Sequence, residues 1–489
     1  MSTTLYWHDY ETFGTDPRRD RPAQFAGIRT DEALNEIEEP LVIYCKPAHD
    51  FLPHPAACLL TGITPQIADT QGLPEPHFIA HIYAELARPG TCGVGYNTLR
   101  FDDEVTRHTL YRNFYNPYDR EWQQGNSRWD MIDLVRMTYA LRPNGIVWPQ
   151  HDDGRPSFRL ENITAANGIG HQAAHDALSD VRATISLARL LRDRQPRLYR
   201  WLFQLRNKHK AAALLDLTAH TPVLHTSRMY ATDIGCTTLV MPLIAEPGNN
   251  NSILVYDLRQ NPENFFGLAV NELSERLFTR SEALPEGTVR LPVKSIKINK
   301  CPALAPSNTL DTAAIKRLAI DLEACHQHYN QLQKNPDFFC KVASAYTSRK
   351  PASNGDVDVA LYENFLGNDD SSLLANVRNA TPQQLANTHF CFHDHRLPEL
   401  LFRYRARNWP ETLNVSERQK WEEFRRQRLT EENGGGSITL KEFSDQILML
   451  RDQYKNQDNA QVILDEIDAW AKMLLTPVNI DEKHTKFCQ

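Results

Sequence analysis

The stretch Leu5-Tyr6-Trp7-His8-Asp9-Tyr10-Glu11-Thr12-Phe13-Gly14 decides how the first part of the chain is interpreted. Its first six residues predict a short strand. Side chains two residues apart on a strand share a face, so Asp9 and Glu11 should present two carboxylates side by side. Two unpaired carboxylates repel each other, and their hard oxygen ligands suit Mg²⁺ or Mn²⁺. Taken alone, a D-x-E pair is more often a solvated pair on an edge strand.

Around this stretch, strand-like and helix-like patterns alternate as far as about residue 195. We expect further strands at 24–30, 41–45 and 91–96, and helices at 78–86, 101–114 and 177–194. The helix at 177–194 has the clearest apolar stripe. Early strands followed by mixed helices and strands predict a mixed-sheet α/β domain over residues 1–195.

The remainder of the 489 residues is long enough for two more domains, since a domain has roughly 150 residues. Gln195-Pro196 should end the preceding helix, because proline disfavours helical geometry in the residue before it. Residues 196–350 contain β-type runs at 237–241, 252–256 and 289–293, and predict a β-containing domain. Residues 351–489 are expected to be helical, at 416–428, 443–454 and 460–474, with Gly434-Gly435-Gly436 as a flexible connector.

The composition is that of an ordinary globular protein, with 41% hydrophobic and 24% charged residues. It excludes disordered, collagen-like and disulfide-scaffold chains. No run approaches 18 uncharged apolar residues, so we expect no membrane span. The first residues also lack the features of a signal peptide. Nine cysteines without a C-x-x-C pair favour reduced thiols in the cytoplasm. The net charge of −7 argues against a wholly basic nucleic-acid binder, although local clusters decide what a surface binds.

Two further motifs carry acids. Asp102 follows an apolar strand and opens a helix, where the helix dipole also favours an acid. His175 precedes the helix at 177–194, and Asp180 lies about a turn and a half further on, on a largely apolar helix. Asp176 between them is a natural N-cap. A buried carboxylate such as Asp180 is costly unless it is paired or bound to a metal.

In chain order these motifs are D-x-E, N-x-x-x-F-D and H-x-x-x-x-D. The set resembles the histidine-containing branch of the DEDD superfamily of 3′-to-5′ exonucleases, whose nuclease domain has a ribonuclease H-like sheet. Flanking runs, in order and across nearly the whole chain, resemble the bacterial exonuclease I family; they lie at 8–14, 21–25, 95–97, 101–105, 156–161, 206–210, 299–302 and 404–408. The resemblance implies an α/β exonuclease domain at 1–195, an SH3-like β-containing domain at 196–350 and a helical C-terminal domain at 351–489.

The resemblance also implies catalytic roles. Asp9, Glu11 and Asp180 would ligate metal directly, with Asp102 completing the site. His175 would be the general base for the attacking water. Two Mg²⁺ ions about 4 Å apart, with Mn²⁺ as a possible substitute, would stabilise the attacking and leaving oxygens. The implied activity is processive hydrolysis of single-stranded DNA from the 3′ end to 5′-mononucleotides, in DNA repair and recombination.

Cations gather in two regions that could bind a strand. Nine Lys and Arg residues against one acid lie between Arg182 and Lys210, although such a run can equally be a solvated face. Between Arg100 and Trp129, cations alternate with aromatic residues, of which Tyr115 and Trp129 fit better in a core. By the resemblance, the DNA contacts would be Glu11, Arg107, Tyr118, Trp122, Arg136, Arg159 near the scissile end, Lys208 and Lys300.

The family also binds the acidic C-terminal tail of single-stranded DNA-binding protein, and Arg142 and Trp201 are the candidate contacts; Trp201 stands where the family has tyrosine. We expect a cytoplasmic monomer. The cluster His389, Cys391, His393 and His395 alternates as on one strand face, but structural zinc sites use other spacings, so we expect ordinary packing or surface residues. Two alternatives stay open: an RNA-trimming exonuclease of the same superfamily, and a non-catalytic nucleic-acid-binding scaffold.

Overall fold

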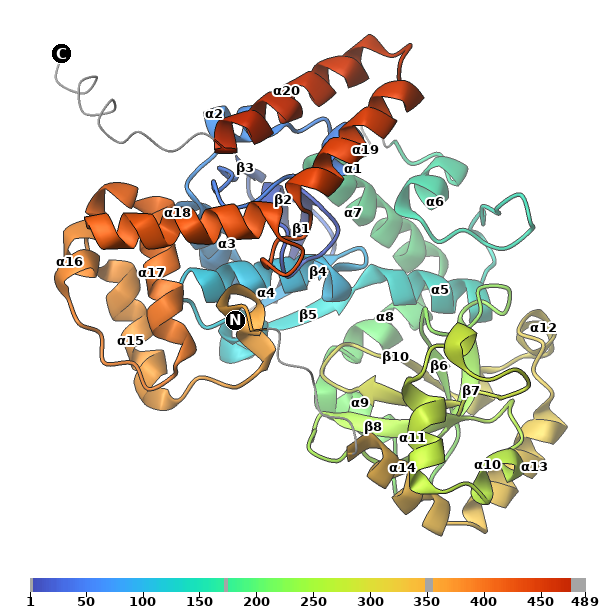
Figure 1. The fold of residues 1–489 in the computed structure, drawn as a ribbon. Coiled ribbons are helices and arrows are strands. Elements are labelled where there is room, and N and C mark those ends of the chain that lie inside the picture. The colour runs from blue at the N-terminus through green and yellow to red at the C-terminus, as the bar shows by residue number, and fades with distance from the viewer. Residues whose placement is uncertain (1–2, 171–174, 348–354, 476–489) are drawn as a thin grey trace.

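The computed structural model describes residues 3–170, 175–347 and 355–475. Figure 1 shows a first sheet with helices around it, a second sheet to its lower right, and a C-terminal set of helices on the opposite side. The predicted break after Arg194 is present, because one helix ends there and the next begins at Pro196. The predicted boundary at residue 350 lies outside the described residues.

The first sheet has the strand order β3-β2-β1-β4-β5. Strand β2 pairs antiparallel with both β1 and β3. On the other side of the sheet, β4 pairs in parallel with β1, and β5 pairs in parallel with β4. Their bounds are β1 Thr4–Thr12, β2 Pro22–Thr30, β3 Leu41–Tyr44, β4 Thr91–Gly95 and β5 Ser127–Asp130. This mixed sheet confirms the predicted α/β class and the ribonuclease H-like arrangement.

The two faces of β1 pack against different helices. Tyr6 and Tyr10 share a hydrophobic cluster with α3 (Glu75–Leu86) and α4 (Asp102–Arg112). Leu5 and Trp7 share a larger cluster with α5 (Met131–Leu141) and α7 (Ala177–Arg194). Because side chains alternate along a strand, Asp9 and Glu11 extend the row of Leu5 and Trp7 on the α7 face. Three shorter helices complete this part: α1 Pro55–Thr61, α2 Pro65–Gln71 and α6 Leu160–Ala166.

The second sheet is antiparallel throughout, in the order β10-β6-β7-β8-β9. Its strands are β6 Val223–Thr226, β7 Thr237–Ala245, β8 Ser252–Asp257, β9 Val293–Lys297 and β10 Ala303–Pro306. The strand predicted at 289–293 is wrong for residues 289–292. Pro292 has no N–H for a sheet ladder, and its carbonyl instead accepts a hydrogen bond from Asp257.

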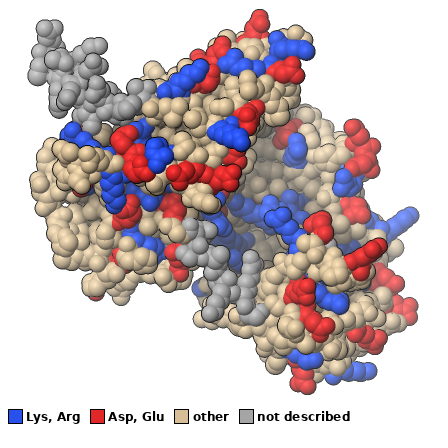
Figure 2. All heavy atoms as spheres, in the orientation of Figure 1, with Lys and Arg blue, Asp and Glu red and all other residues tan. Residues whose placement is uncertain are grey.

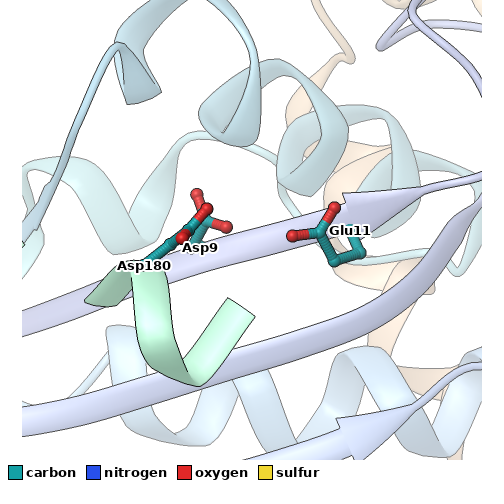
Figure 3. Close-up of side chains that lie close together, drawn as sticks. All are labelled: Asp9, Glu11 and Asp180. Atoms are coloured by element: carbon teal, nitrogen blue, oxygen red, sulfur yellow. The ribbon is translucent and has the colours of Figure 1, made fainter. Parts of the chain in front are cut away.

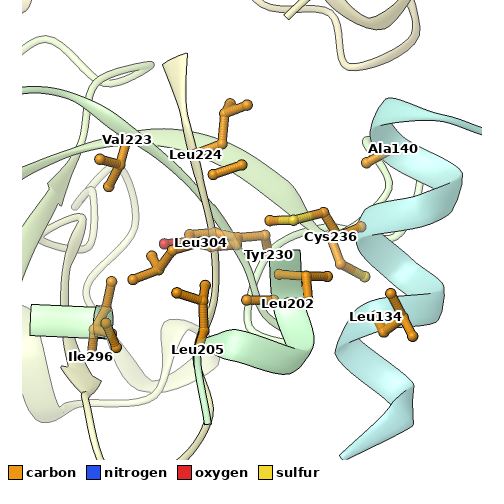
Figure 4. Packing of buried hydrophobic residues seen from close by; sticks show 14 of the residues in the cluster. Leu134, Ala140, Leu202, Leu205, Val223, Leu224, Tyr230, Cys236, Ile296 and Leu304 are labelled. Atoms are coloured by element: carbon orange, nitrogen blue, oxygen red, sulfur yellow. The ribbon is translucent and has the colours of Figure 1, made fainter. Parts of the chain in front are cut away.

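The helices of this region are α8 Pro196–Gln204, α9 Lys208–Leu214, α10 Glu263–Phe266, α11 Val270–Phe278, α12 Thr312–Arg317, α13 Leu322–Gln333 and α14 Asp337–Thr347. One hydrophobic core continues from the first sheet into the second. In Figure 4, Leu202 lies beside Tyr230. Leu134 of α5 belongs to the same buried cluster as Tyr230 and Leu304. The two regions are therefore packed together rather than joined only by a linker.

The C-terminal region is helical, as predicted: α15 Asn368–Asn379, α16 Pro382–Asn387, α17 Arg396–Asn408, α18 Val415–Thr430, α19 Leu440–Gln453 and α20 Asp458–Leu475. Helices α19 and α20 share a core with α1 and α2 of the first region. The glycine run before α19 is closely packed rather than a free connector. A Cβ atom on Gly434 would lie 2.1 Å from the Gln427 carbonyl oxygen, and Gly435 has a φ of +88°.

Charged residues also join the C-terminal region to the first one. The Arg407 guanidinium donates to both Asp50, just before α1, and Asp358 in a 3₁₀ turn at Val357–Tyr362. Asp50 and Asp358 are fully buried, so each depends on such partners. Among the residues that the structure describes, no helix combines the length and apolar character needed to cross a bilayer.

Candidate active site

Three carboxylates meet where β1 ends beside the start of α7. One ligand oxygen each from Asp9, Glu11 and Asp180 lies within 4.8 Å of the others. Figure 3 shows Asp9 and Glu11 on the same face of β1, with Asp180 reaching toward Asp9 from α7. Glu11 is buried, while Asp9 and Asp180 are half-buried. The alternation predicted for D-x-E therefore brings both acids to the same side as Asp180.

Local capping explains why Asp180 faces the strand. The Asp176 side chain accepts a hydrogen bond of 3.1 Å from the Ser179 N–H, as expected for an N-cap. The Ala177 N–H donates to the Gln24 side chain at 3.3 Å, which ties the first turn of α7 to β2. Asp180 follows in that same turn.

The electrostatics of the three carboxylates favour a cation. Burial, and then the negative charges of Asp180 and Asp176, raise the pKa of Glu11 to about 8. Burial and the charges of Asp102, Glu11 and Asp180 raise the pKa of Asp9 well above its ordinary value. Such groups lose most of this penalty when a positive charge lies between them. The donor set, three carboxylate oxygens and no sulfur or nitrogen, fits a hard divalent metal ion.

Asp102 lies beside this group but outside it. Its Oδ1 atom accepts a hydrogen bond of 3.1 Å from the Tyr10 backbone N–H, and it is almost fully buried at the start of α4. Burial raises its pKa well above the ordinary value, with a further contribution from Asp103. Asp102 also lies in the first turn of α4, where the helix dipole favours an acid as predicted, and the N-cap itself is Phe101.

Asp130 is a residue that the motifs did not reveal. Its carboxylate accepts hydrogen bonds from the N–H groups of Asn97, Leu99 and Ile132, at 2.8, 3.1 and 3.0 Å. It thereby fixes the turn that leads from β4 to Asp102, in which Asn97 has a φ of +65°. An aspartate between a strand and an apolar helix is an N-cap signal, but its bonds to residues 97 and 99 depend on the fold.

His175 lies one residue before the N-cap of α7. It is half-buried, with a φ of +67° in the left-handed region. Residues 171–174, which precede it, lie outside the description. Among the described residues, the close group of ligand atoms comprises Asp9, Glu11 and Asp180, without Asp102 or His175.

Three of the proposed DNA contacts are exposed side chains. Trp122 is 65% exposed, the Arg159 side chain is 72% exposed, and Lys208 is exposed at the first position of α9. Figure 2 shows the surface hollowed between the two main parts of the molecule, with Lys and Arg side chains gathered in the hollow. A basic groove of this kind can follow a phosphate backbone.

The other proposed contacts already have protein partners. Arg107 is buried and donates to both oxygens of Glu121, at 2.7 and 2.8 Å, and lies over the Tyr118 ring. Arg136 pairs with Asp133 at 2.7 Å, and Lys300 with Glu104 at 3.4 Å. Each pair joins residues that are far apart in the sequence or one helical turn apart. A count of charges along the chain does not reveal such pairs.

Part of the basic run from 182 to 210 is likewise structural. Arg189 and Arg192 donate to the backbone carbonyls of Leu34 and Ala33. The Arg206 guanidinium lies 3.6 Å from the centroid of the Phe203 ring. Trp129 is buried, as expected, and Tyr115 packs against Tyr83.

Arg142 and Trp201, far apart in the sequence, line one pocket. Its volume is about 470 Å³, and Arg197, Leu198 and Pro306 contribute to its walls. Arg142 donates to the Thr309 carbonyl at 3.0 Å, and the Trp201 indole N–H donates to the Leu304 carbonyl at 2.8 Å. The pocket thus combines an apolar floor with two arginines.

The histidines and cysteine at 389–395 do not lie on a strand. The segment is irregular and leads into α17. The N–H groups of His393 and Asp394 donate hydrogen bonds to Asp370 of α15. Within the described ranges, these residues form no close group of metal ligands. The eight cysteines in those ranges are free thiols.

Three family descriptions match consecutive parts of the chain. Residues 6–188 match an exonuclease family, residues 206–348 the exonuclease I SH3-like domain, and residues 355–474 the exonuclease I C-terminal domain. The chain is 45% identical over 476 residues to exodeoxyribonuclease I of Escherichia coli strain K12, which covers 97% of this chain and 99% of that relative.

Solved structures of the same kind superpose closely. Exonuclease I from Methylocaldum szegediense is 50% identical, with a TM-score of 0.93 over 97% of this chain and 100% of that one. E. coli exonuclease I in complex with a dA16 oligonucleotide is 45% identical, with the same TM-score and coverage. Other E. coli structures are described as a zinc-bound form of the complex with single-stranded DNA and as SSB/exonuclease I with an inhibitor. The family descriptions span most of the chain and the relatives cover nearly all of it, so the chain belongs to the exonuclease I family, as its motifs predicted.

Proposed function

We propose that this protein is a 3′-to-5′ exonuclease that hydrolyses single-stranded DNA processively to 5′-mononucleotides, in DNA repair and recombination. The observation that carries the proposal is the group of three carboxylates from β1 and α7, in a chain that matches exonuclease I along its length. The relatives are named exodeoxyribonuclease I, and one related structure holds a bound oligonucleotide; both support the choice of DNA.

Asp9, Glu11 and Asp180 would hold two Mg²⁺ ions, with Mn²⁺ as a possible substitute. When bound, these ions would neutralise the negative charge that collects on phosphate oxygens during hydrolysis. Asp102 would complete the site by holding the Tyr10 N–H, and with it the strand segment that carries Asp9 and Glu11. His175 would take the proton from the attacking water, as the resemblance implies.

The strand would enter along the basic hollow. Trp122 offers an exposed ring for base stacking, and Arg159 and Lys208 offer unburied cations for phosphates. Arg107, Tyr118, Arg136 and Lys300 remain proposed contacts. For Arg107 and Lys300, contact with DNA would require sharing a cation already paired with Glu121 or Glu104. Glu11 would lie near the terminal nucleotide because it is one of the three clustered carboxylates.

The pocket of Arg142 and Trp201 would bind the C-terminal tail of single-stranded DNA-binding protein. By the resemblance that tail is acidic, which suits a pocket flanked by Arg142 and Arg197. The related SSB/exonuclease I structure supports this class of partner. Arg142→Glu should abolish binding of a tail peptide in fluorescence polarisation, whereas Arg155→Glu, on an exposed loop, should not.

We keep the domain limits of 1–195, 196–350 and 351–489 as a proposal. The helix break at Gln195 and the family descriptions at 206–348 and 355–474 support it. We also propose that the protein is a monomer and that it acts in the cytoplasm, on the proposed DNA substrate. Sedimentation of the full chain would reveal any larger assembly.

A time course with 3′-labelled and 5′-labelled single strands tests the activity. With Mg²⁺, a 3′ label should be released at once as a mononucleotide. A 5′ label should pass from the full-length strand to the shortest products with few intermediates, because the proposed digestion is processive. EDTA should stop both reactions. A matched RNA strand distinguishes the RNA-trimming alternative, and faster loss of RNA would overturn the choice of substrate. A non-catalytic scaffold would bind the strands alike with and without metal and cleave neither.

A further inference from the structure

A second pocket lies in the SH3-like region, apart from the three carboxylates. Its volume is about 630 Å³, and its walls come from β9, the end of α11 and the loops around Tyr230 and Arg259. Three cationic side chains line it: Arg259, Arg290 and Lys294. Asp257 is the acid among the lining residues, and it already accepts hydrogen bonds from Thr238 and from the Arg259 backbone N–H.

Lys294 is the central feature of this pocket. It sits on β9 opposite Val255 of β8, and its Nζ atom is buried 3.3 Å from the centroid of the Tyr230 ring. Among the described residues, no hydrogen-bond acceptor contacts that atom. The Nε atom of Arg259 lies 3.7 Å from an Asp257 carboxylate oxygen, an ion pair too long for a hydrogen bond. Burial lowers the pKa of the Lys294 amine to about 7, against the opposing charge of Asp257. An anion beside this amine would favour its charged form and accept its unused hydrogen-bond donors.

The rim of the pocket is apolar. Met229 is 61% exposed and Val289 is 49% exposed, although both belong to the pocket lining. Large apolar side chains at the mouth of a cationic pocket suit a ligand with one anionic end and one flat apolar end. A nucleotide has this combination, since its phosphate is anionic and its base is flat.

One residue of the pocket wall, His225, lies near a cation of the nuclease region. Burial, followed by the charges of Lys294 and Arg100, lowers the pKa of His225 in the pocket wall to about 3. Arg100 belongs to the turn that leads into Asp102. The site therefore lies within electrostatic reach of the segment that supports the metal group.

We propose that this pocket binds a nucleotide, with the phosphate on Lys294 and Arg290 and the base against Met229 and Val289. This proposal depends on the proposed exonuclease function in one respect: the function explains where the nucleotide would come from. A released 5′-mononucleotide and a nucleotide within a bound strand carry the same chemistry, and the experiment separates them.

The experiment measures binding to the full chain in EDTA, where no hydrolysis is expected. Titration calorimetry is run with 5′-dAMP, with deoxyadenosine and with a single-stranded oligonucleotide. The variant is Lys294→Met, and the matched control is Lys297→Met, an exposed lysine three residues further along β9. Thermal unfolding of each variant checks the fold, and Lys294→Arg tests whether a cation alone restores binding.

If the mononucleotide is the ligand, Lys294→Met should weaken 5′-dAMP binding by about tenfold or more. Lys297→Met should leave it unchanged, and deoxyadenosine should bind much more weakly than 5′-dAMP. If the ligand is part of a strand, only the oligonucleotide should lose affinity with Lys294→Met. Equal affinity of the wild type and Lys294→Met for both ligands would overturn the proposal. A chain that binds 5′-dAMP through Lys294 but never degrades DNA would instead overturn the proposed function and leave this site standing.

Discussion

The Oδ1 atom of Asp102 accepts a hydrogen bond of 3.1 Å from the backbone N–H of Tyr10. Tyr10 is the residue between Asp9 and Glu11, so this bond joins the start of α4 to the strand segment that carries two of the three close carboxylates. The Tyr10 ring packs on the opposite face of the sheet, against Phe25 and Phe78. Asp102 thus contributes both a negative charge and a fixed backbone position.

The two contributions can be separated by substitution. Asp102→Asn keeps an oxygen that can accept the Tyr10 bond but removes the charge, whereas Asp102→Ala removes both. We expect both variants to lose hydrolysis of single-stranded DNA by a factor on the order of 10² or more. Only Asp102→Ala should also lower the free energy of unfolding, by about 1–3 kcal/mol, because the buried N–H loses its partner. Equal stability of the two variants in urea unfolding would show that the bond does not hold the strand.

Asp9→Ala should abolish cleavage and leave DNA binding largely intact. The substitution removes one of the three clustered carboxylates, whereas Trp122, Arg159 and Lys208 lie on exposed surface. We expect turnover to fall by a factor on the order of 10³ or more, with the dissociation constant for an oligonucleotide changed by less than about threefold. Near-normal turnover of Asp9→Ala would refute the assignment of β1 as the metal-binding strand.

The helix at 177–194 and most strands of the first sheet could be predicted, because periodic apolar residues and an N-cap aspartate act locally. The D-x-E pair could be placed on one face for the same reason. The strand predicted at 289–293 was wrong for residues 289–292, because the observed strand begins at Val293. The run is apolar enough for a strand, but Pro292 has no N–H to pair with a neighbouring strand. The partners of Arg107 and the three bonds of Asp130 could not be predicted, since they join residues brought together only by the fold.

Lys208→Ala should reduce the salt dependence of DNA binding. Lys208 begins α9 beside the junction of the two sheets and is exposed. If it contacts one phosphate, the slope of log K against log salt should become shallower by about one. Lys441→Ala, an exposed lysine on α19, is the control and should leave the slope unchanged. An unchanged slope for Lys208→Ala would show that Lys208 does not contact the DNA strand.

The stability of the metal-free protein should fall as the pH rises. Burial and the charges of Asp180 and Asp176 raise the pKa of Glu11 from 4.5 to about 8 in the folded state. The folded state therefore holds a proton that the unfolded state releases, and stability is lost as the pH rises between those two values. Glu11→Gln should remove part of this loss, and Mg²⁺ should offset it in the wild type. Urea unfolding in EDTA at several pH values measures it; a pH-independent difference between wild type and Glu11→Gln would contradict the prediction.

Arg407 should be a main determinant of how firmly the C-terminal region is attached. Its guanidinium donates to Asp50 at 2.8 Å and to Asp358 at 2.9 Å, and both acids are buried from different parts of the chain. Arg407→Ala would remove the cation closest to both buried carboxylates. Arg428 would remain, 3.6 Å from Asp50 and 3.3 Å from Asp358. We therefore expect a loss of about 3 kcal/mol in the free energy of unfolding, the lower end for a broken buried pair. Arg426→Ala, which breaks an exposed pair with Glu423, should cost no more than about 1 kcal/mol. If the two substitutions had equal effects in chemical denaturation, the Asp50–Arg407–Asp358 bridge would not be what holds the two regions together.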